Sequence, residues 1–192
     1  MLALYFAPGA SSMAVHIALH EIGAVFEARP LSFHRRENRT PAYLALNPEG
    51  KVPTLLIDGR PLTEVAAILF YLARQFPKAG LLPDGVEAEA QALSWMSFAA
   101  ATLHPARRQG IDHAAAVYGI ADRRMAGRTW LFDRYSVADI HLFRLYWRFS
   151  ASLRPSPDAF PNLAAHHDRV VTRPAVQRTL EIEAAIGYEL PA

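Results

Sequence analysis

The stretch LALYFAPGASSMAVHIAL, residues 2–19, passes directly from a strand-like run through a turn into a helix. Leu2–Phe6 is short, apolar and aromatic, as expected of a strand. Either Ser11 or Ser12 can cap the helix, which ends at Gly23. Backbone N–H groups at a helix start, beside two hydroxyl groups, favour an anion. Plain helix capping would also explain both serines.

The chain then repeats this alternation of strands and helices. Residues 26–31 form a weaker strand candidate, followed by a polar loop with an irregular helix. Thr54–Ile57 is predicted to be a strand, joined by an Asp-Gly turn to a short return strand near Leu62. The next helix has Glu64 in its first turn, where a carboxylate meets the helix dipole favourably. The order β-α-β, loop, β-β-α predicts a small mixed sheet with helices on its faces.

Residues 77–85 are rich in proline and glycine and are predicted to be a linker. The part of the chain after this linker has almost no sequence patterns typical of strands. The second part has long apolar and aromatic residues at helical spacing. Within it, Ser136 and Asp139 have the spacing of a capping box, a structural motif at a helix start. We therefore expect two domains, an α/β domain over residues 1–76 and an all-α domain over residues 86–192.

The composition of the 192 residues excludes several classes of function. The 20 basic and 18 acidic side chains give a net charge of +2, with no basic run interleaved with aromatic residues, so nucleic acid is not an expected partner. No apolar stretch approaches the roughly 20 residues that span a bilayer, and no charged region precedes a long apolar one at the N-terminus. We therefore expect a cytoplasmic protein without a membrane partner. The absence of cysteine excludes disulfides, thiolate metal sites and mixed disulfides with a substrate.

Two further segments of the first part could bind a ligand. In KVPTLL, Pro53 cannot donate to a sheet ladder, so it should begin the strand, and a cis bond there would expose the Val52 backbone to a peptide-like ligand. In LTEVAAI, the Glu64 carboxylate can bind an ammonium group while nearby backbone N–H groups bind a carboxylate. A turn proline and a solvated glutamate are the simpler alternatives.

Together and in this order, PGASSMAVHIAL, NPEGKVPTLL and LTEVAAILFYLA resemble the N-terminal signatures of the glutathione transferase family. The linker and the SVADI segment of the second part resemble the same family, so the resemblance covers essentially the whole chain. It implies a thioredoxin-like N-terminal domain, an all-helical C-terminal domain and a homodimer. The closest resemblance is to the bacterial beta class, in which the first helix follows a run of proline, glycine, alanine and cysteine.

The chain departs from the beta class at the position of that cysteine, which is Ser11. In the related theta and zeta classes, a serine near this point helps to stabilise the glutathione thiolate. A hydrogen bond of about 1.5–3 kcal/mol to the thiolate would lower the thiol pKa by roughly one to two units. Ser11 is therefore the expected catalytic residue, with Ser12 as the second candidate and the Tyr5 hydroxyl as the third.

The resemblance also implies how the rest of glutathione is held. Val52, beside a cis Pro53 and next to Lys51, would pair with the cysteinyl backbone, and Glu64 would hold the γ-glutamyl ammonium group. The family often has serine after this glutamate, whereas this chain has Val65, so the backbone N–H groups there would bind the γ-glutamyl carboxylate instead. The expected basic residue for the glycyl carboxylate is one of two neighbours, Arg35 or Arg36.

Histidines and a serine of the remaining chain are weaker candidates. In WMSFAAATLHPARR, His104 and Ser97 match positions from which the beta class directs polar side chains toward the thiol, although a histidine at a helix end also suits the helix dipole. His16 and His20 have the spacing of a metal pair, but no third ligand is evident, so no metal is expected. His166 is expected at the surface.

The sequence therefore predicts a transferase that conjugates reduced glutathione to a small hydrophobic electrophile, a detoxification reaction. One alternative is a non-catalytic glutathione-binding or interaction protein with the same fold. The other is a zeta-like isomerase that uses glutathione as a cofactor. Redox branches of the family that need a protein thiol are excluded by the absence of cysteine.

Overall fold

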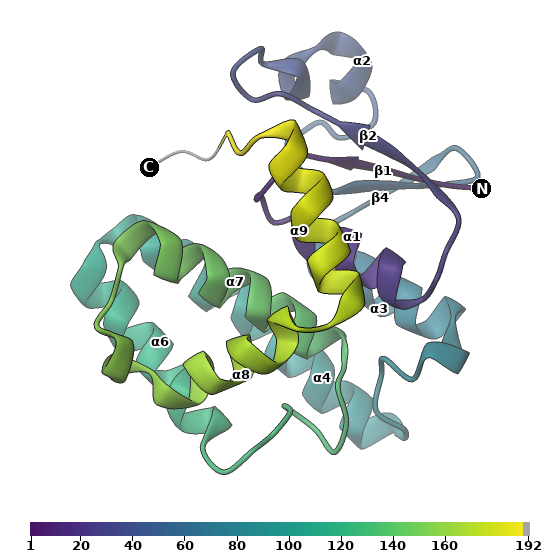
Figure 1. Cartoon of the computed structure of the whole chain (residues 1–192). Coiled ribbons are helices and arrows are strands. Elements are labelled where there is room, and N and C mark those ends of the chain that lie inside the picture. The colour runs from purple at the N-terminus through teal and green to yellow at the C-terminus, as the bar shows by residue number, and fades with distance from the viewer. Residues whose placement is uncertain (190–192) are drawn as a thin grey trace. The chain divides into compact units, whose positions relative to one another are not determined.

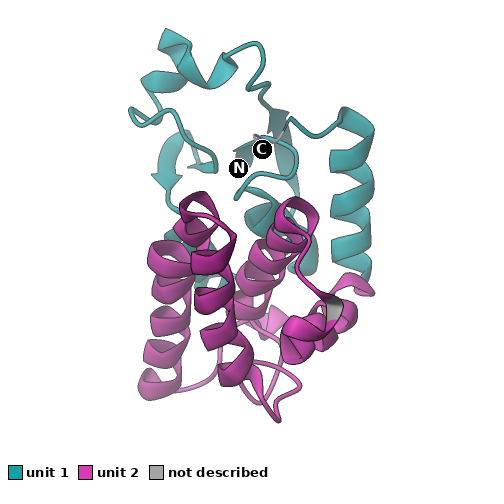
Figure 2. Ribbon diagram, turned by 90° about the vertical axis from the view of Figure 1, so that its left-hand side faces the viewer, with its two compact units in different colours: residues 1–76, 174–192 teal, residues 77–173 magenta. Residues whose placement is uncertain are grey.

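The computed structural model describes residues 1–189, of Pro157 the backbone only, in two compact units (Figures 1 and 2). The first unit comprises Met1–Phe76 and the segment from Pro174 onward, and the second comprises Pro77–Arg173. This division differs from the expected one, which assigned all of residues 86–192 to the helical domain. The physical reason is that helix α9, Pro174–Ile186, packs against helix α1 of the first unit.

A four-stranded mixed sheet forms the centre of the first unit, with the order β2-β1-β3-β4. Strand β1 (Leu2–Phe6) pairs in parallel with β2 (Phe26–Pro30) and antiparallel with β3 (Thr54–Ile57), which pairs antiparallel with β4 (Arg60–Thr63). The bounds of β1 and β3 confirm the predicted strands. β4 contains a proline, which is tolerated because β4 lies at the edge of the sheet.

Helix α1 (Met13–Glu21) is the central helix of the first unit. It contacts β1, α9 and α3 (Val65–Gln75), so all residues from Met13 to Leu19 are buried. A helix that is covered on several sides needs no polar face, which explains its nearly continuous apolar sequence. The short helix α2 (Pro41–Leu44) and a 3₁₀ turn, η1 (Glu37–Arg39), form the irregular helical segment expected between β2 and β3.

The second unit is a helical bundle in which α7 (Val137–Leu153) is the most buried helix. It contacts α4 (Val86–Phe98) and α8 (Pro161–Val171), and α6 (Ile111–Met125) packs against α8. The shorter elements of this unit are η2 (Pro77–Ala79), a π-helical turn η3 (Ala99–Leu103), α5 (His104–Ala106), η4 (Arg107–Gln109) and η5 (Pro157–Ala159). The two domain types confirm the predicted fold class.

The start of α7 carries the predicted capping box. The Ser136 backbone N–H and hydroxyl both donate to Asp139 Oδ2, at 2.9 and 2.7 Å. The other carboxylate oxygen of Asp139 lies 3.0 Å from His166 Nε2, and both side chains are almost fully buried. The predicted surface position of His166 is therefore wrong, because its ring is buried in the bundle, where it contacts the Asp139 carboxylate that also caps α7.

Candidate functional site

The structure brings Ser11 and Val52 together in the first unit, although 41 residues separate them. The Ser11 hydroxyl donates a hydrogen bond to the Val52 carbonyl oxygen at 2.8 Å, and the Ser11 side chain is only partly buried. The Val52–Pro53 peptide bond is cis, as predicted. Ala10 and Val52 also share one buried apolar cluster. Two segments predicted to contact the same ligand therefore meet at one place.

Ser12 lies inside the protein, with a fully buried side chain. Its hydroxyl donates to the Ala7 carbonyl oxygen and accepts from the Ala7 N–H, both at 3.2 Å. A single hydroxyl has one proton to donate, so this proton serves the turn before α1. The geometry thus gives Ser12 a structural position and leaves Ser11 as the serine with a partly exposed side chain.

Tyr5, the third candidate, is tied to the neighbouring strand. Its hydroxyl accepts a hydrogen bond from Arg29 Nη1 at 2.8 Å, directly across the β1–β2 ladder. Its ring meets the Tyr43 ring edge-on, with centroids 5.4 Å apart. These contacts hold Tyr5 against the apolar cluster that includes Ala10 and Val52.

The loop before the cis proline is held by side chains that the sequence analysis missed. The Lys51 carbonyl oxygen accepts hydrogen bonds from the Tyr43 hydroxyl at 2.5 Å and from Asn47 Nδ2 at 2.8 Å. The Gly50 carbonyl oxygen accepts from Asn38 Nδ2 at 2.7 Å. Carbonyl groups that lose contact with water require hydrogen-bond partners. The polar side chains of Asn38, Tyr43 and Asn47, shortly before this loop, could therefore have been predicted to bond its backbone. The backbone just before Val52 is therefore held by three side-chain hydrogen bonds.

Glu64 occupies the N-cap position of α3, one residue earlier than predicted, and its side chain is exposed. Its φ of 69° lies in the region that favours glycine, so the residue is held in a conformation that costs free energy. The first backbone N–H groups of α3, at Val65 and Ala66, have no intrahelical acceptor. A carboxylate thus adjoins two N–H donors, a pattern complementary to the ammonium and carboxylate groups of an α-amino acid.

The candidate cations for a ligand carboxylate differ in their surroundings. Arg35 Nε lies 3.0 Å from Glu37 Oε1, and Lys51 forms an ion pair with Glu49. Arg36 is exposed, and its guanidinium has no side-chain partner within residues 1–189. Of the two neighbouring arginines, Arg36 therefore has the side chain with more freedom to bind an external carboxylate.

His104 and Ser97 belong to the second unit. His104 is half-buried and follows the π-helical turn η3, while Ser97 is exposed on α4. The turn has a local cause, since Pro105 has no N–H to donate and its ring would clash with the carbonyl group four residues earlier. Burial lowers the pKa of the His141 ring to about 3, and the charges of His104 and Arg144 contribute to this shift.

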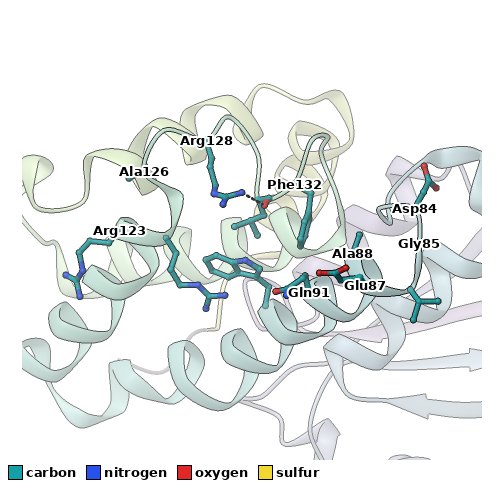
Figure 3. A pocket seen from close by; sticks show the side chains of 13 residues that line it. Asp84, Gly85, Glu87, Ala88, Gln91, Arg123, Ala126, Arg128 and Phe132 are labelled. Carbon is teal, nitrogen blue, oxygen red and sulfur yellow. Dashed lines mark hydrogen bonds between the residues drawn. The ribbon is translucent and has the colours of Figure 1, made fainter.

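A cavity of about 920 Å³ lies in the second unit, between the start of α4 and the end of α6 (Figure 3). Its lining includes Trp95 and Arg124, whose guanidinium carbon lies 3.6 Å from the centre of the Trp95 ring. Arg128 reaches the Leu131 carbonyl oxygen at its rim (Figure 3). The cavity contains none of the residues predicted to bind glutathione, so it is separate from the site around Ser11.

Within residues 1–189, no group of three or more histidine, cysteine, aspartate or glutamate side chains could hold a metal ion. The His16 and His20 rings are tilted relative to one another, with centroids 5.0 Å apart, and burial, with the nearby His16 and Arg178, lowers the pKa of His20 to about 4. In the same described part of the chain, no helix combines the length and apolarity needed to cross a bilayer.

Known proteins resemble this chain in sequence and in fold. Residues 1–74 match the family model for the glutathione S-transferase N-terminal domain, and residues 86–174 match that for its C-terminal domain. Glutathione S-transferase GST-4.5 of Xanthomonas campestris is 32% identical, over 94% of this chain and 98% of that protein. A maleylacetoacetate isomerase of Pseudomonas aeruginosa is 31% identical, over 88% of this chain and 90% of that protein. A sphingomonad glutathione S-transferase solved in complex with glutathione has a TM-score of 0.84 and 36% identity, over 95% of this chain and 98% of that chain.

Proposed function

This chain belongs to the glutathione S-transferase family, and from that premise we propose that it binds reduced glutathione in its first unit and joins it, through its sulfur, to a small hydrophobic electrophile. The observation that carries the proposal is the hydrogen bond between the Ser11 hydroxyl and the Val52 carbonyl group. It puts the proposed partner of the sulfur beside the proposed partner of the cysteinyl backbone, as one tripeptide requires.

In the proposed reaction, the glutathione thiol loses its proton to solvent and the thiolate attacks an electrophilic carbon, whose leaving group departs. Ser11 stabilises the thiolate by turning its hydroxyl from the Val52 carbonyl oxygen toward the sulfur. The positive end of the α1 dipole lies next to Ser11 and favours the same anion. Neither contribution needs a protein thiol, which the chain lacks.

The two ends of the tripeptide are proposed to bind where complementary groups lie. Glu64 takes the γ-glutamyl ammonium group, and the N–H groups of Val65 and Ala66 take the adjoining carboxylate. Arg36 takes the glycyl carboxylate, because Arg35 and Lys51 are each paired with a glutamate. Because this chain has Val65 where the family usually has serine, the γ-glutamyl carboxylate would be bound by backbone N–H groups alone.

The helical unit is proposed to provide the surface for the electrophile, with His104 and Ser97 as its polar contributors. We further propose a cytoplasmic homodimer that acts in detoxification, as in the family that the sequence resembles. Sedimentation of the purified chain tests the dimer directly, since a dimer has twice the mass of the 21.3 kDa chain.

Conjugation of glutathione to chlorodinitrobenzene, followed by absorbance, tests the proposed activity. We expect a saturable rate that depends on both substrates and is lost when S-methyl-glutathione, which has no thiol, replaces glutathione. A rate equal to that of the uncatalysed reaction, in a preparation that still binds glutathione, would instead support the non-catalytic alternative.

The similarity to a maleylacetoacetate isomerase favours a second candidate, a glutathione-dependent isomerase. Such an enzyme would add the glutathione thiolate to a cis-enediolone, allow rotation about the resulting single bond and release unchanged glutathione. Turnover of a cis-enediolone with no net consumption of glutathione would establish this reaction. Consumption of one glutathione per product would establish conjugation instead.

A further inference from the structure

The loop that follows β2 binds a carboxylate from the segment beyond α9. The Ser32 hydroxyl shares its proton between the two oxygens of Glu189, at 2.8 Å from Oε1 and 3.0 Å from Oε2. The His34 backbone N–H donates to Glu189 Oε2 at 3.0 Å. Ser32 is buried, and the Glu189 side chain is 27% exposed. The segment beyond α9 is thus tied to a loop 157 residues earlier in the chain.

The same hydroxyl orders the backbone that leads to Arg36. Ser32 Oγ accepts a hydrogen bond from the Arg35 N–H at 3.0 Å, so the contact with Glu189 fixes the direction of its proton while its lone pair binds the loop. A second carboxylate, Glu37, accepts from the Ser32 N–H at 2.7 Å. Arg36 has a φ of 55°, in the left-handed region that is costly for a residue with a side chain. The two carboxylates therefore stabilise a loop conformation that costs free energy at Arg36.

The loop also adjoins the candidate site. The side chain of Phe33 packs against the apolar cluster that contains Ala10 and Val52. Phe33 lies between the two residues that donate to Glu189, so a shift of the loop would also move a side chain that borders this cluster. One short loop thus connects Glu189 to the surroundings of Val52 and carries Arg36 as well.

We propose that Glu189 is a positioning residue for the glutathione site: by bonding Ser32 and His34, it holds the loop so that the Arg36 guanidinium meets the glycyl carboxylate. The inference rests on the proposed function, in which Arg36 takes that carboxylate. A loop that already has its bound conformation loses less conformational entropy when a ligand binds, so the contact raises the affinity for glutathione. The glycyl carboxylate takes no part in the reaction at the sulfur, so the effect falls on KM and not on kcat.

Variants at the two ends of the contact test the inference. Glu189→Met keeps the length of the side chain and removes both acceptor oxygens, and Ser32→Ala removes the hydroxyl. Glu181→Met is the matched control, because it removes an exposed carboxylate from α9. Calorimetry measures the Kd for reduced glutathione and for its glycinamide analogue, in which a neutral amide replaces the glycyl carboxylate. Steady-state kinetics gives kcat and KM for conjugation separately.

We expect Glu189→Met to raise Kd and KM for glutathione about three- to tenfold, with kcat changed less than about twofold. Ser32→Ala should have a similar effect, and the double variant should bind only about as weakly as either single variant, because all three lose the same contact. The Kd of Glu189→Met for the glycinamide analogue should stay within about twofold of the wild type. Glu181→Met should match the wild type with both ligands.

The comparison of the two ligands separates positioning of Arg36 from a general structural role. A general role would weaken binding of glutathione and of the glycinamide analogue by the same factor, and that result would overturn the inference. An unchanged affinity of Glu189→Met for glutathione would overturn it as well.

Amide hydrogen exchange tests the contact without glutathione. We expect the His34 amide to exchange several-fold faster in Glu189→Met than in the wild type, because its acceptor is lost, and at the wild-type rate in Glu181→Met. An unchanged rate at His34 in Glu189→Met would overturn the inference even if glutathione binds. If the wild type binds no glutathione but the His34 amide responds as expected, the proposed function fails while the hold of Glu189 on the loop stands.

Discussion

At the scale of single residues, the chain separates two neighbouring serines into two tasks. The Ser12 hydroxyl is buried and bonded to the backbone of Ala7, whereas the Ser11 hydroxyl is bonded to the Val52 carbonyl group at a partly open place. A hydroxyl that already has a good acceptor nearby can exchange it for a thiolate at little cost, because the direction of its proton is set by a simple rotation.

Ser11→Ala should therefore lower kcat for conjugation by about ten- to hundredfold, since the lost hydrogen bond to an anion amounts to about 1.5–3 kcal/mol. KM for glutathione should change little, because the tripeptide is held elsewhere. Steady-state kinetics checks both values, and Ser11→Thr, which retains a hydroxyl, is the matched control. A kcat for Ser11→Ala equal to that of the wild type would remove Ser11 from the mechanism.

Polar residues show where sequence reasoning succeeded and where it stopped. Ser136 and Asp139 were identified because a capping box has a fixed local spacing. The burial of His166 and Glu183 was missed because their partners, Asp139 and His16, are 27 and 167 residues away. A buried polar residue looks like a surface residue until its distant partner is known, and no local pattern supplies that partner.

At the scale of elements, the segment from Asn47 to Pro53 is held by both hydrogen bonds and steric fit. Gly50 has a φ of +62°, and a Cβ at that position would lie 2.7 Å from Arg39 Nη1 and 2.8 Å from the Asn38 carbonyl oxygen. The backbone carbonyl is a harder obstacle than the flexible arginine. The segment therefore requires glycine for two independent reasons.

Gly50→Ala should shift this segment and weaken glutathione binding, because Val52 lies two residues further along the same loop. We expect a loss of more than about 1 kcal/mol in the free energy of unfolding, measured with urea, together with a higher Kd in calorimetry. Gly59→Ala is the matched control, since Gly59 also has a positive φ but a Cβ there would meet nothing within 4 Å. Equal effects of the two substitutions would contradict a specific role of the segment.

Helix α7 carries a buried histidine whose protonation opposes folding. The pKa of His141 is lowered to about 3 by burial and by the neighbouring charges of His104 and Arg144. Its value in the unfolded chain is about 6.5, so below that pH the unfolded state binds a proton that the folded state refuses. The stability is complete above pH 6.5 and is lost as the pH falls toward 3. His20 of α1 acts in the same direction.

The free energy of unfolding should therefore fall by about 2 kcal/mol between pH 7 and pH 5 through His141 alone. Urea denaturation at the two pH values measures this difference. In His141→Leu, which has nothing to titrate at that position, the difference should be smaller by the same amount. An identical pH dependence in this variant and in the wild type would show that His141 is protonated in the folded protein.

At the scale of the whole molecule, the last helix, α9, belongs to the same compact unit as the first strand and helix of the chain. The strands, the first helix and the helical character of the second unit were predictable from apolar periodicity and turn residues. The return of α9 was not, because its apolar pattern resembles that of any bundle helix. Helix α9 belongs to the first unit because it packs against α1. This packing also brings Glu183 into contact with the Gly9 N–H.

The central claim is that one glutathione molecule is held between Glu64 and the Ser11–Val52 contact. Calorimetric titration of reduced glutathione tests it most directly, with the wild type, Glu64→Ala, and Glu87→Ala as the control with a glutamate at the start of another helix. We predict saturable binding that weakens about tenfold or more in Glu64→Ala and is unchanged in Glu87→Ala, because a charge-assisted hydrogen bond is lost only at Glu64. No binding at millimolar glutathione, or equal affinity in Glu64→Ala and the wild type, would contradict the claim.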